Sequence, residues 1–156
     1  MNLITKFLLT VFFNFIALEV FTIDIPKDLI VKIIKESKNE DDIKSENLDL
    51  ISVNYTGWIF ESNSQTNNYC DAKGKMFDSN IFDRFHHTFP FQFILGKGLV
   101  IKGWDLGLQD MKINEQRCLV IPPHLAYGNR GIGNIIKPNS TLIFEVKLLK
   151  ILKVEK

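Results

Sequence analysis

The sequence predicts an α+β fold in which a twisted antiparallel sheet of about five or six strands wraps around one short helix. Several short stretches alternate between apolar and polar residues, as half-buried strands do. Only residues 100–111 place their apolar residues at helical spacing, and no strand–helix alternation calls for a parallel sheet. With 156 residues, 46% of them apolar and 24% charged, the chain is long enough for one domain with a real core.

The first predicted strands lie in the N-terminal half of the chain. Residues 26–35 are rich in β-branched side chains and alternate only in part, which indicates an edge strand. Residues 50–60 begin with strict alternation, so that Ile51 and Tyr55 share one face. The polar residues 61–75 then predict a long hairpin insertion, and loops of more than about 12 residues are often functional.

Shorter strands and the helix follow. We expect strands at residues 76–78, 89–95, 116–121 and 141–151. In the second of these, every other residue from Phe89 to Leu95 would point to one side of the sheet. The predicted helix would bury the face that holds Trp104.

The N-terminus has the composition of a secretory signal peptide. Lys6 is followed by an apolar run of about a dozen residues, which is shorter than the ~20 residues of a membrane span. We therefore expect a signal peptide over residues 1–22 and a mature domain over residues 23–156. An uncleaved membrane anchor and a buried core element are the alternatives. The last residues, 154–156, are not an ER-retention signal, which leaves both the ER lumen and secretion open.

A secretory route changes the interpretation of the two cysteines. In an oxidising compartment Cys70 and Cys118 could form one disulfide, or they could be a loop thiol and a strand thiol that never meet, because sequence does not give their separation. Two acceptor motifs for N-glycosylation are present, at Asn54 and Asn139. Asn139 follows a proline in a predicted turn and is the better candidate.

The composition argues against several classes of function. A net charge of +1 gives no reason to expect a nucleic-acid partner. No Gly-x-Ser-x-Gly motif is present, and the glycines of residues 128–133 do not match a phosphate-binding loop. Two cysteines without a suitably spaced histidine do not predict a metal site. His86 and His87 are adjacent and are interpreted as solvated loop histidines. We therefore expect neither a metal nor a cofactor.

Aromatic residues recur at positions that alternation points inward. They are Tyr55, Phe77, Phe91, Phe93, Trp104, Tyr127 and Phe144. Periodicity alone assigns them to the core. So many large rings would crowd a small domain, however, and an aromatic-walled pocket would leave some of them partly exposed.

The segments around these rings carry the motifs of a known family. In chain order they are Tyr55-Thr56-Gly57, Phe77-Asp78-Ser79, Phe91-Gln92-Phe93, Val100-Ile101-Lys102-Gly103-Trp104-Asp105, Ile121-Pro122, Ala126-Tyr127-Gly128 and Leu142-Ile143-Phe144-Glu145-Val146. On these motifs the chain resembles the FKBP-type peptidyl-prolyl cis/trans isomerases, over about residues 24–150. Within that family it is most similar to the small ER-lumenal members.

The resemblance implies an FKBP-like fold, isomerase activity and the identity of the pocket residues. The catalytic residues would be Tyr55, Phe77, Asp78, Trp104 and Tyr127. The substrate-binding residues would be Phe91, Val100, Ile101, Ile135, Ile136 and Phe144. The partners would be proline-containing polypeptides and macrolide immunosuppressants such as tacrolimus and rapamycin. A proline-peptide binding module or a chaperone with little catalysis is the alternative.

Overall fold

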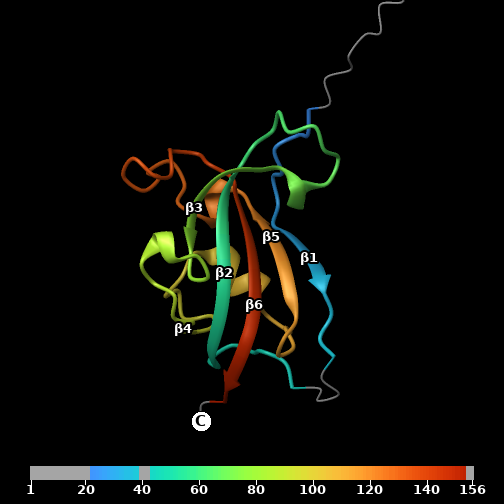
Figure 1. The fold of residues 1–156 in the computed structure, drawn as a ribbon, viewed down its shortest axis with the longest axis vertical. Coiled ribbons are helices and arrows are strands. Elements are labelled where there is room, and N and C mark those ends of the chain that lie inside the picture. The colour runs from blue at the N-terminus through green and yellow to red at the C-terminus, as the bar shows by residue number, and fades with distance from the viewer. Residues whose placement is uncertain (1–21, 39–42, 154–156) are drawn as a thin grey trace, which may run out of the picture.

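The computed structural model describes residues 22–38 and 43–153. The predicted signal peptide therefore lies outside the described residues, apart from its last residue. Within these ranges no helix has the length and apolar character needed to cross a membrane. The described residues form an antiparallel sheet with one short helix behind it (Figure 1), which confirms the predicted fold class.

The sheet contains six strands in the spatial order β1-β5-β6-β2-β3, and β4 also pairs with β2. The strands are β1 (Ile30–Lys35), β2 (Leu50–Phe60), β3 (Lys73–Ser79), β4 (Phe91–Ile94), β5 (Gln116–Ile121) and β6 (Leu142–Leu152). The helix is α1 (Lys102–Gly107), and the loops contain the 3₁₀ turns η1 (Tyr69–Asp71), η2 (Asp83–Phe85) and η3 (Pro123–Leu125).

The central strand β2 has two neighbours along one edge. Residues 50–53 pair with β4, and residues 56–60 pair with β3. Between the two, the buried side chain of Asn80 accepts from the Tyr55 N–H at 2.7 Å and donates to the Val53 carbonyl at 3.0 Å. The amide side chain thus supplies the hydrogen bonds that a continuous strand would make, and it fixes the backbone of Tyr55.

The helix is shorter than the sequence predicts. The pattern indicates a helix over residues 100–111, whereas α1 ends at Gly107. Arg117 of β5 takes the place of the missing turn, because its guanidinium donates at 2.6–3.0 Å to the carbonyls of Gly107, Gln109 and Asp110. Glu115 pairs with this buried charge. Side-chain donors that satisfy the terminal carbonyls remove the need for further helix.

Two glycines set the distance between α1 and the sheet. A Cβ atom on Gly103 would lie 2.4 Å from the side chain of Ile121, and one on Gly107 would lie 2.8 Å from that of Leu119. A larger residue at either position would push the helix away from β5. The helix carries Trp104, so these glycines also set the depth of that ring.

Strand β4 starts later than predicted. It begins at Phe91 rather than at residue 89, because Pro90 has no N–H to give to a sheet ladder. Phe93 and Leu95 are buried as the alternation predicts, whereas Phe89 is 81% exposed and does not join their face.

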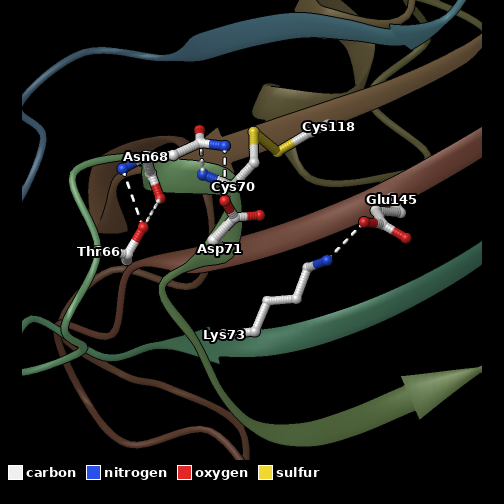
Figure 2. Close-up of a disulfide and its surroundings, with 7 residues drawn as sticks. All are labelled: Thr66, Asn68, Cys70, Asp71, Lys73, Cys118 and Glu145. Carbon is white, nitrogen blue, oxygen red and sulfur yellow. Dashed lines mark hydrogen bonds and ion pairs between the residues drawn. A yellow bond between two sulfur atoms is a disulfide. The ribbon is translucent and has the colours of Figure 1, made fainter.

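Strand β5 buries side chains on both faces of the sheet. On the face that packs on α1, Leu119 and Ile121 belong to the larger core cluster. On the other face, Cys118 and Val120 belong to a smaller cluster. Cys118 forms a disulfide with Cys70, as Figure 2 shows, so the structure contains the bridge that the sequence left open. The bridge fastens the β2–β3 hairpin insertion to β5.

Candidate active site

A pocket opens beside α1, with walls from four strands of the sheet. Its volume is about 290 Å³, near the lower limit of the about 300–1,000 Å³ of small-molecule sites, so it suits one compact group. The residues that line it are Tyr55, Phe77, Asp78, Phe91, Leu99, Val100, Ile101, Trp104, Tyr127 and Phe144.

Trp104 stands at the centre of the aromatic side chains. Its ring centroid lies 5.1 Å from that of Tyr55 and 5.2 Å from that of Phe144, both in edge-to-face geometry. Phe77 makes a further edge contact with Phe144 at 5.5 Å. Such contacts stabilise each ring beyond its simple burial, so the walls are formed before any ligand arrives.

Gly57 makes room for two of these walls. A Cβ atom at this position would lie 2.7 Å from Phe77 and 2.8 Å from Phe144. The glycine of the Tyr-Thr-Gly motif is therefore required by the pocket and not by a turn.

Asp78 is the main hydrogen-bond acceptor of the pocket. The Tyr55 hydroxyl donates to Oδ2 of Asp78 at 2.6 Å, and the Ser79 N–H donates to Oδ1 at 2.8 Å. Burial raises the pKa of Tyr55 above its usual range, and the bond to Asp78 raises it further. Burial, followed by the charge of Asp78, also raises the pKa of Tyr127. Both phenols therefore keep their protons at neutral pH and are available as donors.

A histidine interpreted as solvated contacts the same aspartate. His87 Nε2 lies 2.9 Å from Oδ1 of Asp78. The neighbouring His86 is exposed, as expected. Sequence reasoning missed His87 because it lies in the long β3–β4 loop, where no periodicity reports the direction of a side chain.

Two predicted substrate-binding residues do not line the pocket. Ile136 is 3% exposed and belongs to the large core cluster. Ile135 is 55% exposed and borders a separate groove beside the β2–β3 hairpin. Conversely, Leu99 lines the pocket although it is not among the predicted site residues. Leu99 directly precedes Val100, so its place next to the Val-Ile-Lys-Gly-Trp motif could have predicted that it lines the pocket.

The site suits binding and desolvation. Its walls are aromatic, and its polar groups are two phenols, one carboxylate and the backbone at the start of α1. Across the described residues, no group of three His, Cys, Asp or Glu side chains is placed to hold a metal. The fold and the pocket thus define a small antiparallel-sheet protein with a compact aromatic pocket around a central indole.

Comparison with known families agrees with this class. The family model described as FKBP-type peptidyl-prolyl cis-trans isomerase matches residues 41–149. The chain therefore belongs to the FKBP family, as its motifs predict.

Individual relatives support the same assignment. FK506-binding protein 2B of Rhizopus delemar is 47% identical over 108 residues, which cover 69% of this chain and 44% of the relative. FK506-binding protein 1A of Neurospora crassa is 57% identical over 85 residues, which cover 54% of this chain and 68% of the relative. FK506-binding protein 2 of Yarrowia lipolytica is 42% identical over 117 residues, which cover 75% and 70%. The chain thus matches less than half of the Rhizopus protein.

Proposed function

We propose that this protein is a peptidyl-prolyl cis/trans isomerase that acts in the aromatic pocket. The observation that carries the proposal is the set of ring edges around Trp104, with the hydroxyls of Tyr55 and Tyr127 and the carboxylate of Asp78 among the lining groups. Membership of the FKBP family supports it. A cavity of about 290 Å³ with aromatic walls has room for a proline ring.

The proposed mechanism follows from the physics of the amide bond. Rotation about C–N costs about 18–20 kcal/mol because resonance is lost in the twisted state. The planar amide is more dipolar than the twisted one, so transfer from water into an apolar pocket destabilises the planar form more. Only this difference between ground state and transition state accelerates rotation. In this pocket Trp104 and Phe144 would replace the water around the bond.

The polar groups would hold the two halves of the peptide. The proline ring would pack against Trp104, while the Tyr127 hydroxyl and the Ile101 N–H would bind carbonyls that flank the rotating bond. In the same proposal Phe77 would form part of the apolar wall, and Asp78 would serve as a hydrogen-bond acceptor. Because both tyrosines keep their protons at neutral pH, they would act as hydrogen-bond donors and not as bases.

The test is the rate of X-Pro isomerisation in a short peptide, with and without tacrolimus. We expect drug-sensitive acceleration that falls by about tenfold or more in Trp104→Leu. The matched control is Trp58→Leu, because the other tryptophan packs against the cluster on the opposite face of the sheet. A folded protein that binds proline peptides without acceleration would favour the binding module or chaperone.

The same pocket is proposed to bind macrolides such as tacrolimus and rapamycin. The relatives named FK506-binding protein support this proposal. Asp78→Val and Tyr127→Phe should each weaken tacrolimus binding measured by calorimetry, since both side chains line the pocket. Unchanged affinity in both variants would place the drug elsewhere.

We also propose that the protein enters the secretory pathway, either to remain in the ER lumen or to be secreted. The apolar run after Lys6 and the bond between Cys70 and Cys118 support this location, because disulfides persist in oxidising compartments. N-terminal sequencing of the protein from its own cells should begin near Ile23. A chain that still begins at Met1 would contradict cleavage, and its recovery with membranes would indicate an anchor.

A further inference from the structure

His87 contacts oxygen atoms through both of its ring nitrogens. In the loop between β3 and β4, Nε2 lies 2.9 Å from Oδ1 of Asp78 and Nδ1 lies 2.6 Å from the backbone carbonyl oxygen of Phe85. The side chains of His87 and Asp78 are 48% and 35% exposed, so water reaches the pair. The pair lies at the rim of the pocket, because Asp78 is one of the lining residues.

The two contacts define the protonation state that satisfies this geometry. A neutral imidazole has one N–H and one lone pair, whereas the imidazolium ion has two N–H donors. One partner of His87 is a peptide carbonyl, and the other is a carboxylate that already accepts from Tyr55 and from the Ser79 N–H. A neutral ring would direct its lone pair at one of these oxygens. Only the imidazolium ion donates to both.

We propose that His87 is a positioning residue whose imidazolium form ties the β3–β4 loop to Asp78 and thereby makes ligand binding in the pocket depend on pH. The connection continues inward, because Asp78 accepts from Tyr55, whose ring centroid lies 5.1 Å from that of Trp104. Loss of the proton breaks one of the two contacts of His87, which releases either the carboxylate or the loop. The inference rests on the proposed function for its activity and tacrolimus-binding measurements, but not for the NMR titration described below.

Two described tyrosines interact with the Asp78 member of this pair. Tyr55 of β2 faces Asp78 directly, and Tyr127 lines the same pocket from the loop after η3. On the β3–β4 loop itself, the carbonyl of Asp83 accepts from the N–H of His86 and closes η2, and the side chain of Arg84 lies outside the described part of the structure. Among the side chains that are described, His87 pairs with Asp78, and the pair is ionic when the His87 ring is protonated.

The direction of the pH effect follows from the proton count. Histidine changes charge between about pH 5 and pH 8, so binding is tightest at the acid end and weakens as the pH rises. Since the pair is partly exposed, we expect a change of about two- to fivefold and not of orders of magnitude. The measurement is the Kd for tacrolimus and the rate of X-Pro isomerisation across this pH range at constant ionic strength.

Substitutions of His87 separate its charge from its shape. His87→Arg keeps a cation at every pH and should hold the acid-end affinity throughout, whereas the uncharged His87→Gln should show the alkaline-end affinity throughout. The matched control is His86→Asn, because asparagine tolerates the left-handed backbone (φ 58°) of that exposed neighbour. It should keep the wild-type pH profile. A His87→Gln variant that retains the wild-type profile overturns the proposal.

A second measurement does not depend on catalysis or on a drug. In an NMR titration of the full chain, the indole N–H signal of Trp104 should shift with the same midpoint as the ring of His87, and this shift should be absent in His87→Arg. An indole signal that ignores the titration of His87 overturns the positioning role, even in an active enzyme. A protein that neither isomerises peptides nor binds tacrolimus at any pH would refute the proposed function. The NMR titration would still decide whether protonation of His87 is felt at Trp104.

Discussion

The two faces of the sheet are buried in different ways. The face beside α1 carries the large core cluster, and the aromatic part of that cluster is left open as the pocket. The opposite face carries a small closed cluster around the disulfide between Cys70 and Cys118. The open face is held by many ring and aliphatic contacts, whereas the small cluster under the hairpin is held by a covalent bond. Changes on the open face should therefore alter both ligand binding and stability, whereas changes on the opposite face should alter stability alone.

Removal of the central ring should have the largest effect and should strike both properties. Trp104→Ala deletes a side chain that is 4% exposed and contacts four other rings. We expect a loss of about 3–5 kcal/mol in the free energy of unfolding, as for other buried aromatic deletions, together with loss of tacrolimus binding. Urea unfolding and calorimetry measure the two. Equal losses of stability in Trp58→Ala, a half-buried residue of the opposite face, would contradict the comparison.

Removal of the disulfide should affect stability alone. The bond joins residues that are 48 positions apart, and opening such a loop should lower the free energy of unfolding by about 2–4 kcal/mol. The double variant Cys70→Ala/Cys118→Ala should therefore unfold at lower urea while its Kd for tacrolimus stays within about twofold, which corresponds to less than one kcal/mol. A loss of drug binding as large as that in Trp104→Ala would show that the two faces are not separable.

Removal of the Tyr55 hydroxyl should cost less and should change the alkaline behaviour. Tyr55→Phe loses a bond to a carboxylate, for which we expect about 1–2 kcal/mol at neutral pH. In the folded protein the pKa of Tyr55 is raised by burial and by Asp78, so the unfolded chain ionises first. The contribution of the Tyr55 hydroxyl to the free energy of unfolding is thus fully present below about pH 10, and it is lost as the pH rises further. Unfolding curves at alkaline pH should show a shallower fall in the variant, and an identical fall would contradict this account.

The smallest effect is expected on the exposed side of the hairpin. Lys73 pairs with Glu145, as the dashed line in Figure 2 shows, and its ammonium lies 4.7 Å from the ring centroid of Trp58. Both partners of the ion pair are partly exposed, so Lys73→Met should change the free energy of unfolding by less than about 1 kcal/mol. A larger loss would mean that this surface pair, and not the disulfide, holds the hairpin in place.

Alternation and motifs predicted most of the fold. The bounds of β2 and β5 agree with the sequence prediction, because both strands are flanked by acidic residues or proline. The helix was overestimated, since Leu108 and Met111 are buried in non-helical backbone that Arg117 supports from another strand. Such support depends on tertiary contacts and leaves no periodic signal.

The site was predictable where motifs reach it and not elsewhere. The motif residues from Tyr55 to Phe144 converge on one pocket, while Ile135 and Ile136 lie in a glycine-rich segment whose path no pattern fixes. The contact of His87 with Asp78 and the pairing of Cys70 could not be predicted either, because both depend on the paths of long loops. The predicted roles of these pocket residues in catalysis stay predictions.

The side chain of Asn80 has a consequence for how this fold can vary. Besides its two bonds to β2, it donates at 2.9 Å to the carbonyl of Phe89, at the far end of the β3–β4 loop. The side chain of one buried asparagine thus holds both ends of the β3–β4 loop against β2 by hydrogen bonds. We therefore expect the hydrogen-bonded edge of β2 to stay closed when the segment from Ile81 to Thr88 changes in length, so that such changes reach the pocket through the contact of His87 with Asp78 and not through the backbone of β2.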